Sequence, residues 1–263
     1  LSGKTTLLES ILVATGAINR KGSIPEGNTV GDAAPESRAR EMSVEGNVAT
    51  TEYLGDEWTF LDCPGSVELA QEAINALTVV DIAVVVCEPD IQKALAVSGL
   101  LRVLAEHDIP HMIFINKMDH AESSVKETLE ALQAVSERPL ILREIPIRDG
   151  DDITGHVDLV SERAFQWTAE GPSELTTLPD SVQDREQGAR TELLEALADF
   201  DDDLLESLLE DVVPEAGSIY GQLTKDLQES YIVPVFFGSA ESDSGVRRLL
   251  KALRHEAPEP AAT

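Results

Sequence analysis

The stretch Asn116-Lys117-Met118-Asp119 decides how this chain is interpreted. It follows the apolar run Met112-Ile113-Phe114-Ile115, which predicts a strand, and it precedes a helical pattern at residues 121–135. An aspartate at the end of a parallel strand can accept hydrogen bonds from both N1–H and the 2-amino group of guanine, a pair of donors that adenine lacks. The asparagine can anchor the loop, and the lysine stem can lie along the purine face. A solvated strand-to-helix turn is the alternative, so the rest of the chain has to decide.

A second motif, Ser2-Gly3-Lys4-Thr5-Thr6, stands at the start of the chain and is followed by apolar residues at helical spacing. Gly-Lys-Thr at a helix start is the second half of a phosphate-binding loop, whose backbone N–H groups cradle phosphates. In such a loop Lys4 reaches the β- and γ-phosphate oxygens, and the Thr5 hydroxyl binds Mg²⁺. An ordinary helix start is the alternative. The leading glycine and the preceding strand of the motif are absent from the sequence, so we expect it to begin inside the loop.

The third motif, Asp62-Cys63-Pro64-Gly65, directly follows the strand-like residues Thr59-Phe60-Leu61. An aspartate at the end of a strand can hold Mg²⁺ through a water molecule, and a glycine three residues later lets its backbone N–H approach a γ-phosphate. A plain Pro-Gly turn is the alternative. Each motif is weak alone, but their order along the chain favours one nucleotide pocket built from three loops.

Composition limits the class of protein. The chain has 263 residues, of which 42% are hydrophobic and 26% charged, as in soluble globular proteins. The longest apolar run, Ile82 to Cys87, is too short to span a membrane. The formal net charge of −29 argues against DNA binding, which needs a basic face. We therefore expect a cytoplasmic protein with no DNA or membrane partner, and reduced thiols at Cys63 and Cys87.

The alternation of strand and helix patterns predicts an α/β fold with a doubly wound, mostly parallel sheet, whose ligand loops lie at the carboxyl ends of the strands. The expected elements are a hairpin (50–54 and 58–61), a strand (81–87), a helix (90–105), a strand (232–237) and a final helix (245–255). Gly238-Ser239-Ala240 follows one of these strands, at the same end of the sheet. Residues 16–48 lack periodicity, which favours a functional or mobile connection that ends near Ser43.

The alternation breaks between residues 138 and 229, which predicts an inserted α+β subdomain. Three short strands (141–147, 155–160 and 164–168) and two helices (181–197 and 201–211) are expected there. Residues 191–224 contain no Lys or Arg, whereas acidic residues recur throughout. A solvated acidic face is the simpler explanation, and a docking face for a basic partner is the sharper one.

On these residues the chain resembles the GTP-binding domain of the translational GTPase elongation factor G, with that family's insertion, over essentially its whole length. The resemblance rests on Gly3-Lys4-Thr5-Thr6 and on Asn116-Lys117-Met118-Asp119. It also rests on Ile145-Pro146-Ile147, on Gly155-His156-Val157-Asp158-Leu159-Val160 and on the stretch from Val233 to Ala240. It implies a P-loop NTPase fold whose first strand is missing from the sequence. The implied domains are a GTP-binding domain (1–137 and 230–257), an inserted G′-like subdomain (138–229) and the start of a linker to further domains (258–263).

The resemblance also implies roles for individual residues, with GTP or GDP and Mg²⁺ as cofactors. The nucleotide-binding residues would be Ser2, Gly3, Lys4, Thr5, Thr6, Asp62, Asn116, Lys117, Asp119, Ser239 and Ala240. The Mg²⁺ ligands would be Thr5, Ser43 and, through water, Asp62. Gly65 would sense the γ-phosphate. The implied partners are the ribosome and its stalk protein, which the acidic insertion would contact, and the protein would act as a monomer.

Two departures from the family mark a divergent paralogue. Switch I reads Arg40-Glu41-Met42-Ser43-Val44 where the family has Arg-Gly-Ile-Thr-Ile. Switch II places Ser66 where the family has the histidine that orients the attacking water, and a serine is too short to replace it directly. The expected function is that of a Mg²⁺-dependent GTP/GDP switch acting on the ribosome in elongation, a GTPase with impaired hydrolysis. The alternative is a non-translocating, ribosome-associated regulatory factor with little or no GTPase activity.

Overall fold

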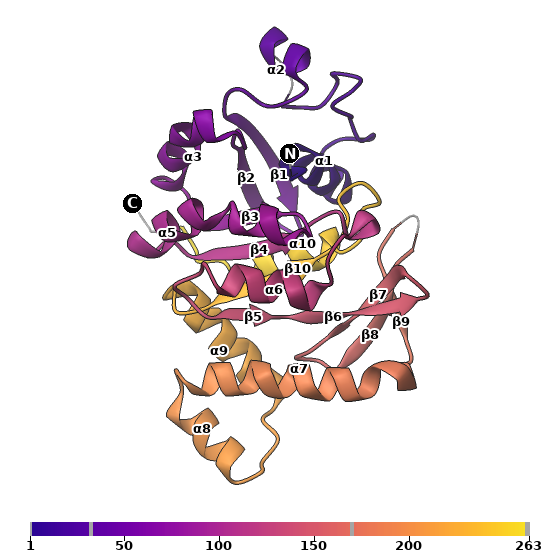
Figure 1. Ribbon diagram of the computed structural model, residues 1–263, viewed down its shortest axis with the longest axis vertical. Helices are drawn as coiled ribbons and strands as arrows, with labels where there is room; N and C mark the ends of the chain where they lie inside the picture. The colour runs from indigo at the N-terminus through magenta and orange to yellow at the C-terminus, as the bar shows by residue number, and fades with distance from the viewer. Residues whose placement is uncertain (1, 32–33, 169–170, 261–263) are drawn as a thin grey trace.

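A four-stranded parallel sheet forms the centre of the molecule. The computed structural model describes residues 2–31, 34–168 and 171–260 (Figure 1). The strand order is β3-β4-β10-β5, and every pairing in this sheet is parallel. The strands are β3 (Ala83–Cys87), β4 (His111–Ile115), β5 (Leu140–Leu142) and β10 (Val233–Phe237). The expected α/β fold with a mostly parallel sheet is therefore confirmed.

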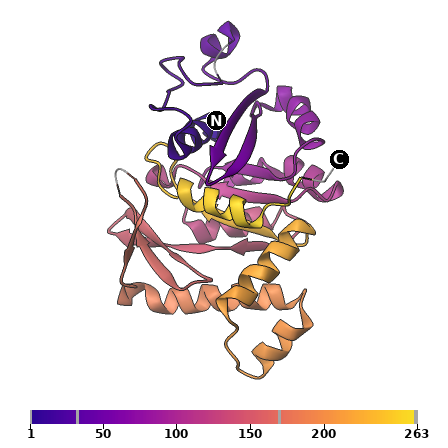
Figure 2. The same cartoon turned by 180° about the vertical axis from the view of Figure 1, so that it is seen from behind.

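Helices cover both faces of this sheet, because alternate side chains of its strands point to opposite sides. Ile113 and Ile115 of β4 belong to one apolar cluster, while Met112 and Phe114 belong to another. One face carries α4 (Ile91–Leu95), α5 (Ser98–Glu106) and α6 (Val125–Gln133), and the other carries α1 (Lys4–Thr15) and α10 (Val246–Glu256). Figure 2 shows α10 crossing the back of the molecule.

The single helix expected at residues 90–105 is wrong, since α4 and α5 are separate elements. The Asp90 side chain caps α4 by accepting hydrogen bonds from the backbone N–H groups of Gln92 and Lys93. Ile91 and Leu95 of α4 are 45% and 41% exposed. In these two helices the buried leucines are Leu101 and Leu104, and both belong to α5.

A hairpin of β1 (Asn47–Tyr53) and β2 (Asp56–Asp62) stands beside the central sheet as a separate two-stranded sheet. The expected hairpin is confirmed, and both strands extend further than the sequence pattern indicated. The short helix α2 (Pro35–Arg40) precedes it, and η1 (Val67–Leu69) and α3 (Ala70–Leu77) follow it. Because β2 ends at Asp62, the hairpin places the third motif beside Thr5 at the start of α1.

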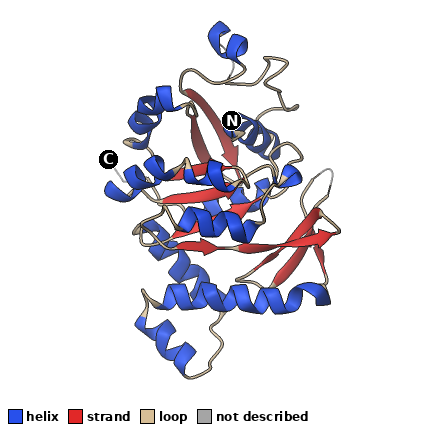
Figure 3. Cartoon of the chain, in the orientation of Figure 1, coloured by secondary structure: helices blue, strands red, loops and turns tan. Residues whose placement is uncertain are grey.

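The region that we assigned to an insertion contains a third sheet, which is four-stranded and antiparallel, together with helices (Figure 3). Its strands are β6 (Glu144–Asp149), β7 (Asp152–Asp158), β8 (Arg163–Gln166) and β9 (Glu174–Thr176). Its helices are α7 (Asp180–Ala198), α8 (Asp202–Leu209) and α9 (Ala216–Gln228). We did not expect β9 or α9. The domain division stays a prediction, but residues 140–142 lie in the parallel sheet, and residues 261–263 of the expected linker lie outside the described residues.

Buried ion pairs join the two parts of the fold. Arg143, which lies between β5 and β6, donates from Nη1 and Nη2 to the two carboxylate oxygens of Glu256 on α10, at 2.6 and 3.1 Å. Arg248 of α10 donates to Asp158 of β7 at 2.6 Å. Burial alone would raise the pKa of Asp158, but Arg248 and neighbouring donors hold it well below its usual range. Among the described residues, no helix is long and apolar enough to cross a membrane.

Candidate functional site

The side-chain amide of Asn116 joins three loops. Asn116 follows β4 and is 2% exposed. Its Nδ2 donates to the backbone oxygen of Ser2 at 2.9 Å, and its Oδ1 accepts from the backbone N–H of Ala240 at 2.8 Å. The backbone N–H of Met118 donates to the backbone oxygen of Gly238 at 3.0 Å. The loops at residues 2–6 and 116–119 therefore meet the loop at residues 238–240, although more than a hundred residues separate each from the next.

Gly3 lies where these loops pack most closely. Its φ is +85°, a conformation that side chains disfavour. A Cβ at this position would stand 2.5 Å from Nδ2 of Asn116 and 3.8 Å from Cε of Lys117. The position thus needs glycine both for its backbone conformation and for space. The helix α1 starts at the next residue, so its free N–H groups face this junction, as an anion-binding loop requires.

Three oxygen-bearing side chains gather at the other end of the first loop. Thr5 Oγ1 donates to Oδ2 of Asp62 at 2.6 Å and lies 3.1 Å from Oγ of Ser43. Thr5 and Asp62 are buried, and Ser43 is half-buried. Two hydroxyls and a carboxylate are hard oxygen donors of the kind that Mg²⁺ prefers. The residues present therefore fit a magnesium ion bound beside the phosphates of a nucleotide.

Lys4 and Gly65 face each other next to this oxygen cluster. A Cβ at Gly65 would collide with Nζ of Lys4, so any other residue would displace this flexible ammonium from the Gly65 backbone. Burial lowers the pKa of Lys4, while the nearby Asp62 carboxylate acts in the opposite direction. A partly desolvated ammonium gains strongly from an anionic ligand, because a low-dielectric surrounding strengthens the attraction.

Ser66 lies directly after Gly65, at the turn into η1. Its backbone oxygen accepts a hydrogen bond from the N–H of Leu69 at 3.1 Å. Its Oγ is buried and has no hydrogen-bond partner among the residues that the structure describes. A buried hydroxyl without a partner is uncommon in folded proteins. The side chain that the resemblance marks as the water-positioning one thus makes no stabilising polar contact within this part of the chain.

The residues expected to contact the guanine base, Asp119, Ser239 and Ala240, are buried to different degrees. Ser239 is 2% exposed, and its backbone exchanges two hydrogen bonds with Ser244, each of 3.0 Å. The Ser239 hydroxyl is buried and unsatisfied within the described ranges. The Asp119 side chain is 33% exposed, and its carboxylate lies 3.8 Å from Nε2 of His120. The Asp119 side chain is therefore accessible, whereas Ser239 and Ala240 are buried.

Two residues that the sequence analysis missed hold the segment before Ser43 against the site. Glu9 of α1 is 1% exposed and accepts hydrogen bonds from the backbone N–H groups of Gly22 and Val30, at 2.7 and 2.6 Å. Lys21 donates to the backbone oxygens of Ala240 and Glu241, at 2.5 and 3.0 Å. A carboxylate in the otherwise apolar helix pattern was the available signal for Glu9. For Lys21 the sequence carries no signal.

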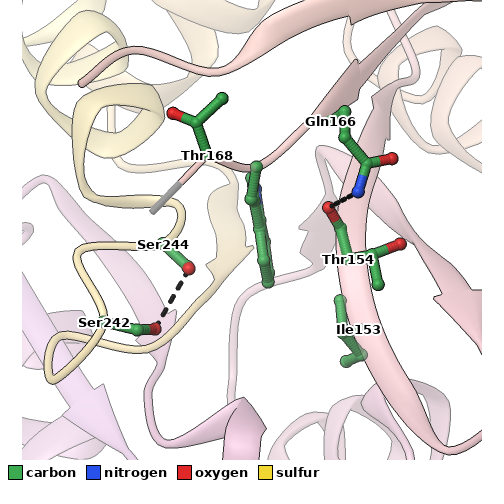
Figure 4. A pocket seen from close by; sticks show the side chains of 7 residues that line it. Ile153, Thr154, Gln166, Thr168, Ser242 and Ser244 are labelled. Atoms are coloured by element: carbon green, nitrogen blue, oxygen red, sulfur yellow. Dashed lines mark hydrogen bonds between the residues drawn. The ribbon is translucent and has the colours of Figure 1, made fainter. Parts of the chain in front are cut away.

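A shallow hollow of about 230 Å³ lies beside the loop that follows Ala240 (Figure 4). Its walls come from β7 and the end of β8 on one side and from Ser242 and Ser244 on the other. Trp167 lines it and donates from Nε1 to Nδ1 of His156 at 3.0 Å. None of the candidate nucleotide residues lines this hollow, so it is a groove between the antiparallel sheet and the base loop rather than the site itself.

The sequence is similar to that of known GTP-binding proteins. The family model of the elongation factor Tu GTP binding domain matches residues 2–259. The chain is 48% identical over 262 residues to "Elongation factor G-like protein" of Synechocystis sp., and 30% identical over 261 residues to "Elongation factor G" of Thermotoga maritima. It is 31% identical over 275 residues to "Ribosome-releasing factor 2, mitochondrial" of Danio rerio. These alignments cover 100%, 98% and 98% of this chain but only 39%, 38% and 36% of those relatives.

A solved crystal structure from Thermus thermophilus has a TM-score of 0.88 to this chain at 27% sequence identity. The match covers 98% of this chain and 39% of the solved one. The likeness therefore takes in the central sheet and the region between residues 138 and 229 together. The chain spans about two fifths of the length of the proteins that it matches.

Replacing Asn116 with Ala should release the base loop. The substitution leaves the Ala240 N–H and the Ser2 oxygen without their partner, which costs about 1–3 kcal/mol for a buried polar group. We expect faster amide hydrogen exchange at Ala240 and a lower free energy of unfolding in urea. Asn116→Asp is the matched control, because it keeps the acceptor for Ala240 and loses the donor to Ser2. Exchange at Ala240 that is unchanged in Asn116→Ala would contradict the role assigned to this amide.

Proposed function

The chain belongs to the family of elongation factor Tu GTP-binding domains, and from that premise we propose that it binds GTP and GDP with Mg²⁺ and acts as the nucleotide switch of a translation factor similar to elongation factor G. The single observation that supports this most strongly is the contact of Thr5 with both Asp62 and Ser43. These side chains come from the first loop, switch I and switch II. A divalent ion bound there would connect both switches to the phosphates.

In this proposal each part of the site has one task. The N–H groups at the start of α1 and the Lys4 ammonium hold the phosphates, with Thr6 beside them. Thr5 and Ser43 ligate Mg²⁺ and Asp62 holds it through water, and the ion neutralises charge on the phosphate oxygens. The Gly65 N–H meets the terminal phosphate. Asp119 and Lys117 bind guanine above the floor formed by Ser239 and Ala240, while Asn116 holds that floor in place.

Nucleotide binding should depend on Mg²⁺ through Asp62. We expect the chain to bind GDP in preference to ADP in calorimetry, more tightly with Mg²⁺ than with EDTA. Asp62→Asn should weaken the Mg²⁺ dependence about 10–100-fold, the usual effect of losing a residue that supports a metal site. Asp56→Asn, at the other end of β2, is the control and should match the unmodified chain. Failure to bind GDP, or equal Mg²⁺ dependence in both variants, would refute the assignment.

GTP hydrolysis is the step for which this sequence differs from the pattern that the resemblance implies. The resemblance places a water-orienting histidine at the position of Ser66, and the serine hydroxyl is buried without a partner among the described residues. We therefore propose slow GTP hydrolysis. That observation also favours the second candidate function, a regulatory or ribosome-associated factor that binds GTP and hydrolyses little of it. The relatives themselves carry different names, elongation factor and ribosome-releasing factor.

Introducing the missing imidazole separates these functions. Ser66→His should raise GTP turnover in the presence of ribosomes by about 10²–10⁴-fold, the usual contribution of a water-positioning or proton-transferring side chain. Ser66→Ala serves as the control and should leave turnover at its starting rate. Phosphate release is the measurement, with and without ribosomes. An ordinary translocase rate before any substitution would exclude the regulatory function, and no gain in Ser66→His would show that another group limits the step.

The acidic face of the insertion is the proposed contact to the ribosomal stalk. Glu192 and Glu195 of α7 and Glu206 of α8 are exposed. Leu209 of α8 and Val213, which follows it, are 78% and 75% exposed, so exposed apolar side chains occur in the same acidic part of the chain. Such a surface fits a partner that is basic with an apolar core. We place the protein in the cytoplasm with the ribosome, as a monomer.

Charge reversal tests this surface. The triple variant Glu192→Lys, Glu195→Lys and Glu206→Lys should slow association with ribosomes about tenfold or more in low salt, because attraction between opposite charges accelerates encounter. The difference should shrink as salt rises, since exposed charges are screened. Reversing Glu45, Glu52 and Glu57 near the hairpin gives the same change in net charge and is the control. Equal association rates in both triple variants would leave the acidic face merely solvated.

A further inference from the structure

Glu88 contacts Lys117 of the loop at residues 116–119 but has no task in the proposed nucleotide site. It directly follows β3, whose last residue pairs with Ile115 at the end of β4. The backbone N–H of Asn116 donates to the oxygen of Cys87 at 2.8 Å, which keeps the two strand ends side by side. Glu88 is 8% exposed, an unusual degree of burial for a carboxylate unless it is paired.

Two lysines share this carboxylate. Nζ of Lys117 donates to Oε1 at 2.7 Å, and Nζ of Lys93 contacts Oε2. Nζ of Lys93 also lies 3.8 Å from a carboxylate oxygen of Asp90, the residue that caps α4. Burial alone would raise the pKa of Glu88, but the two lysines lower it, so the group is charged at neutral pH. The cluster is therefore anchored to β3 on one side and to α4 on the other.

The aliphatic stem of Lys117 is held at both ends. Its backbone has φ +62° and is followed by the hydrogen bond from Met118 to Gly238. At the far end the Glu88 carboxylate holds the ammonium, while Cε passes within 3.8 Å of the position that a Cβ on Gly3 would take. The Lys117 stem thus extends from the loop at residues 116–119 past Gly3 of the first loop. The Lys117 side chain is still 40% exposed, so one of its sides stays accessible to a ligand.

We propose that Glu88 is a positioning residue that holds the stem of Lys117 in place for the face of a bound purine. The inference rests on the proposed nucleotide binding. A lysine side chain that moves freely loses rotamer entropy when it is ordered. The ion pair with Glu88 orders the stem before the ligand arrives, so less of that entropy is lost on binding.

If Glu88 acts only through its charge, its removal should change the nucleotide affinity in the opposite direction. A carboxylate near a polyanionic ligand repels it, and it also competes for the lysine ammonium. Removing the carboxylate would then tighten nucleotide binding and speed association. A positioning role predicts weaker binding and faster dissociation, with little change in the association rate. The direction of the effect separates the two explanations.

A double-mutant cycle on GDP binding tests the proposal, with the fluorescent analogue mant-GDP as the probe. The four proteins are the unmodified chain, Glu88→Ala, Lys117→Met and the double variant. Glu88→Ala alone should weaken binding about fivefold through a higher dissociation rate, within the range found for residues in contact. In the Lys117→Met background the same substitution should have little effect, because the stem it positions no longer carries an ammonium.

Two controls complete the experiment. Glu130→Ala removes one exposed carboxylate from α6 and should leave the affinity unchanged, which accounts for the change in net charge. Glu88→Gln keeps the shape of the side chain and should show a smaller loss of affinity than Glu88→Ala, provided that thermal unfolding shows both variants folded. Tighter binding, an unchanged affinity in Glu88→Ala, or the same loss in both Lys117 backgrounds would overturn the inference. If the unmodified chain binds no mant-GDP, the proposed function fails instead.

Discussion

One buried side-chain amide holds the site together. Asn116 is hydrogen-bonded to Ser2 in the first loop and to Ala240 in the loop after β10, so a single residue at the end of β4 fixes the distance between these two loops. A buried amide of this kind is stable only when its donor and its acceptor are both satisfied. The glycine at position 3 follows from this constraint, because a Cβ there would stand 2.5 Å from Nδ2 of Asn116.

The parallel sheet makes that arrangement possible. Strands β3, β4 and β10 end at the same edge, which places Glu88, Asn116 and Gly238 next to one another although they are far apart in sequence. The hairpin brings Asp62 to the first loop from a separate sheet. Segment 21–30 is held to α1 by Glu9 and to the base loop by Lys21, so the approach to switch I is attached to both ends of the pocket.

The sequence predicts the parts of this site that depend on local spacing. Lys4, Asp62 and Asn116 stand beside a strand or a helix start, where the motif and its backbone context occur together. The helix at 90–105 was wrong because its alanines and valines fit the helical period with or without the break after α4. The strand β9 is exposed at all three positions and has no alternation to detect. Lys21 and Glu88 could not be found, since a charged residue at a strand end or in a loop is usually solvated, and their partners are set only by tertiary packing.

The pairing of Arg143 with Glu256 has a consequence for how such chains diverge. The two residues lie at the edge of the antiparallel sheet and on the last helix, and both are almost fully buried. Losing either partner would strand a charge in the interior, at about 3–5 kcal/mol. Descendants of this lineage should therefore exchange both positions together or keep both.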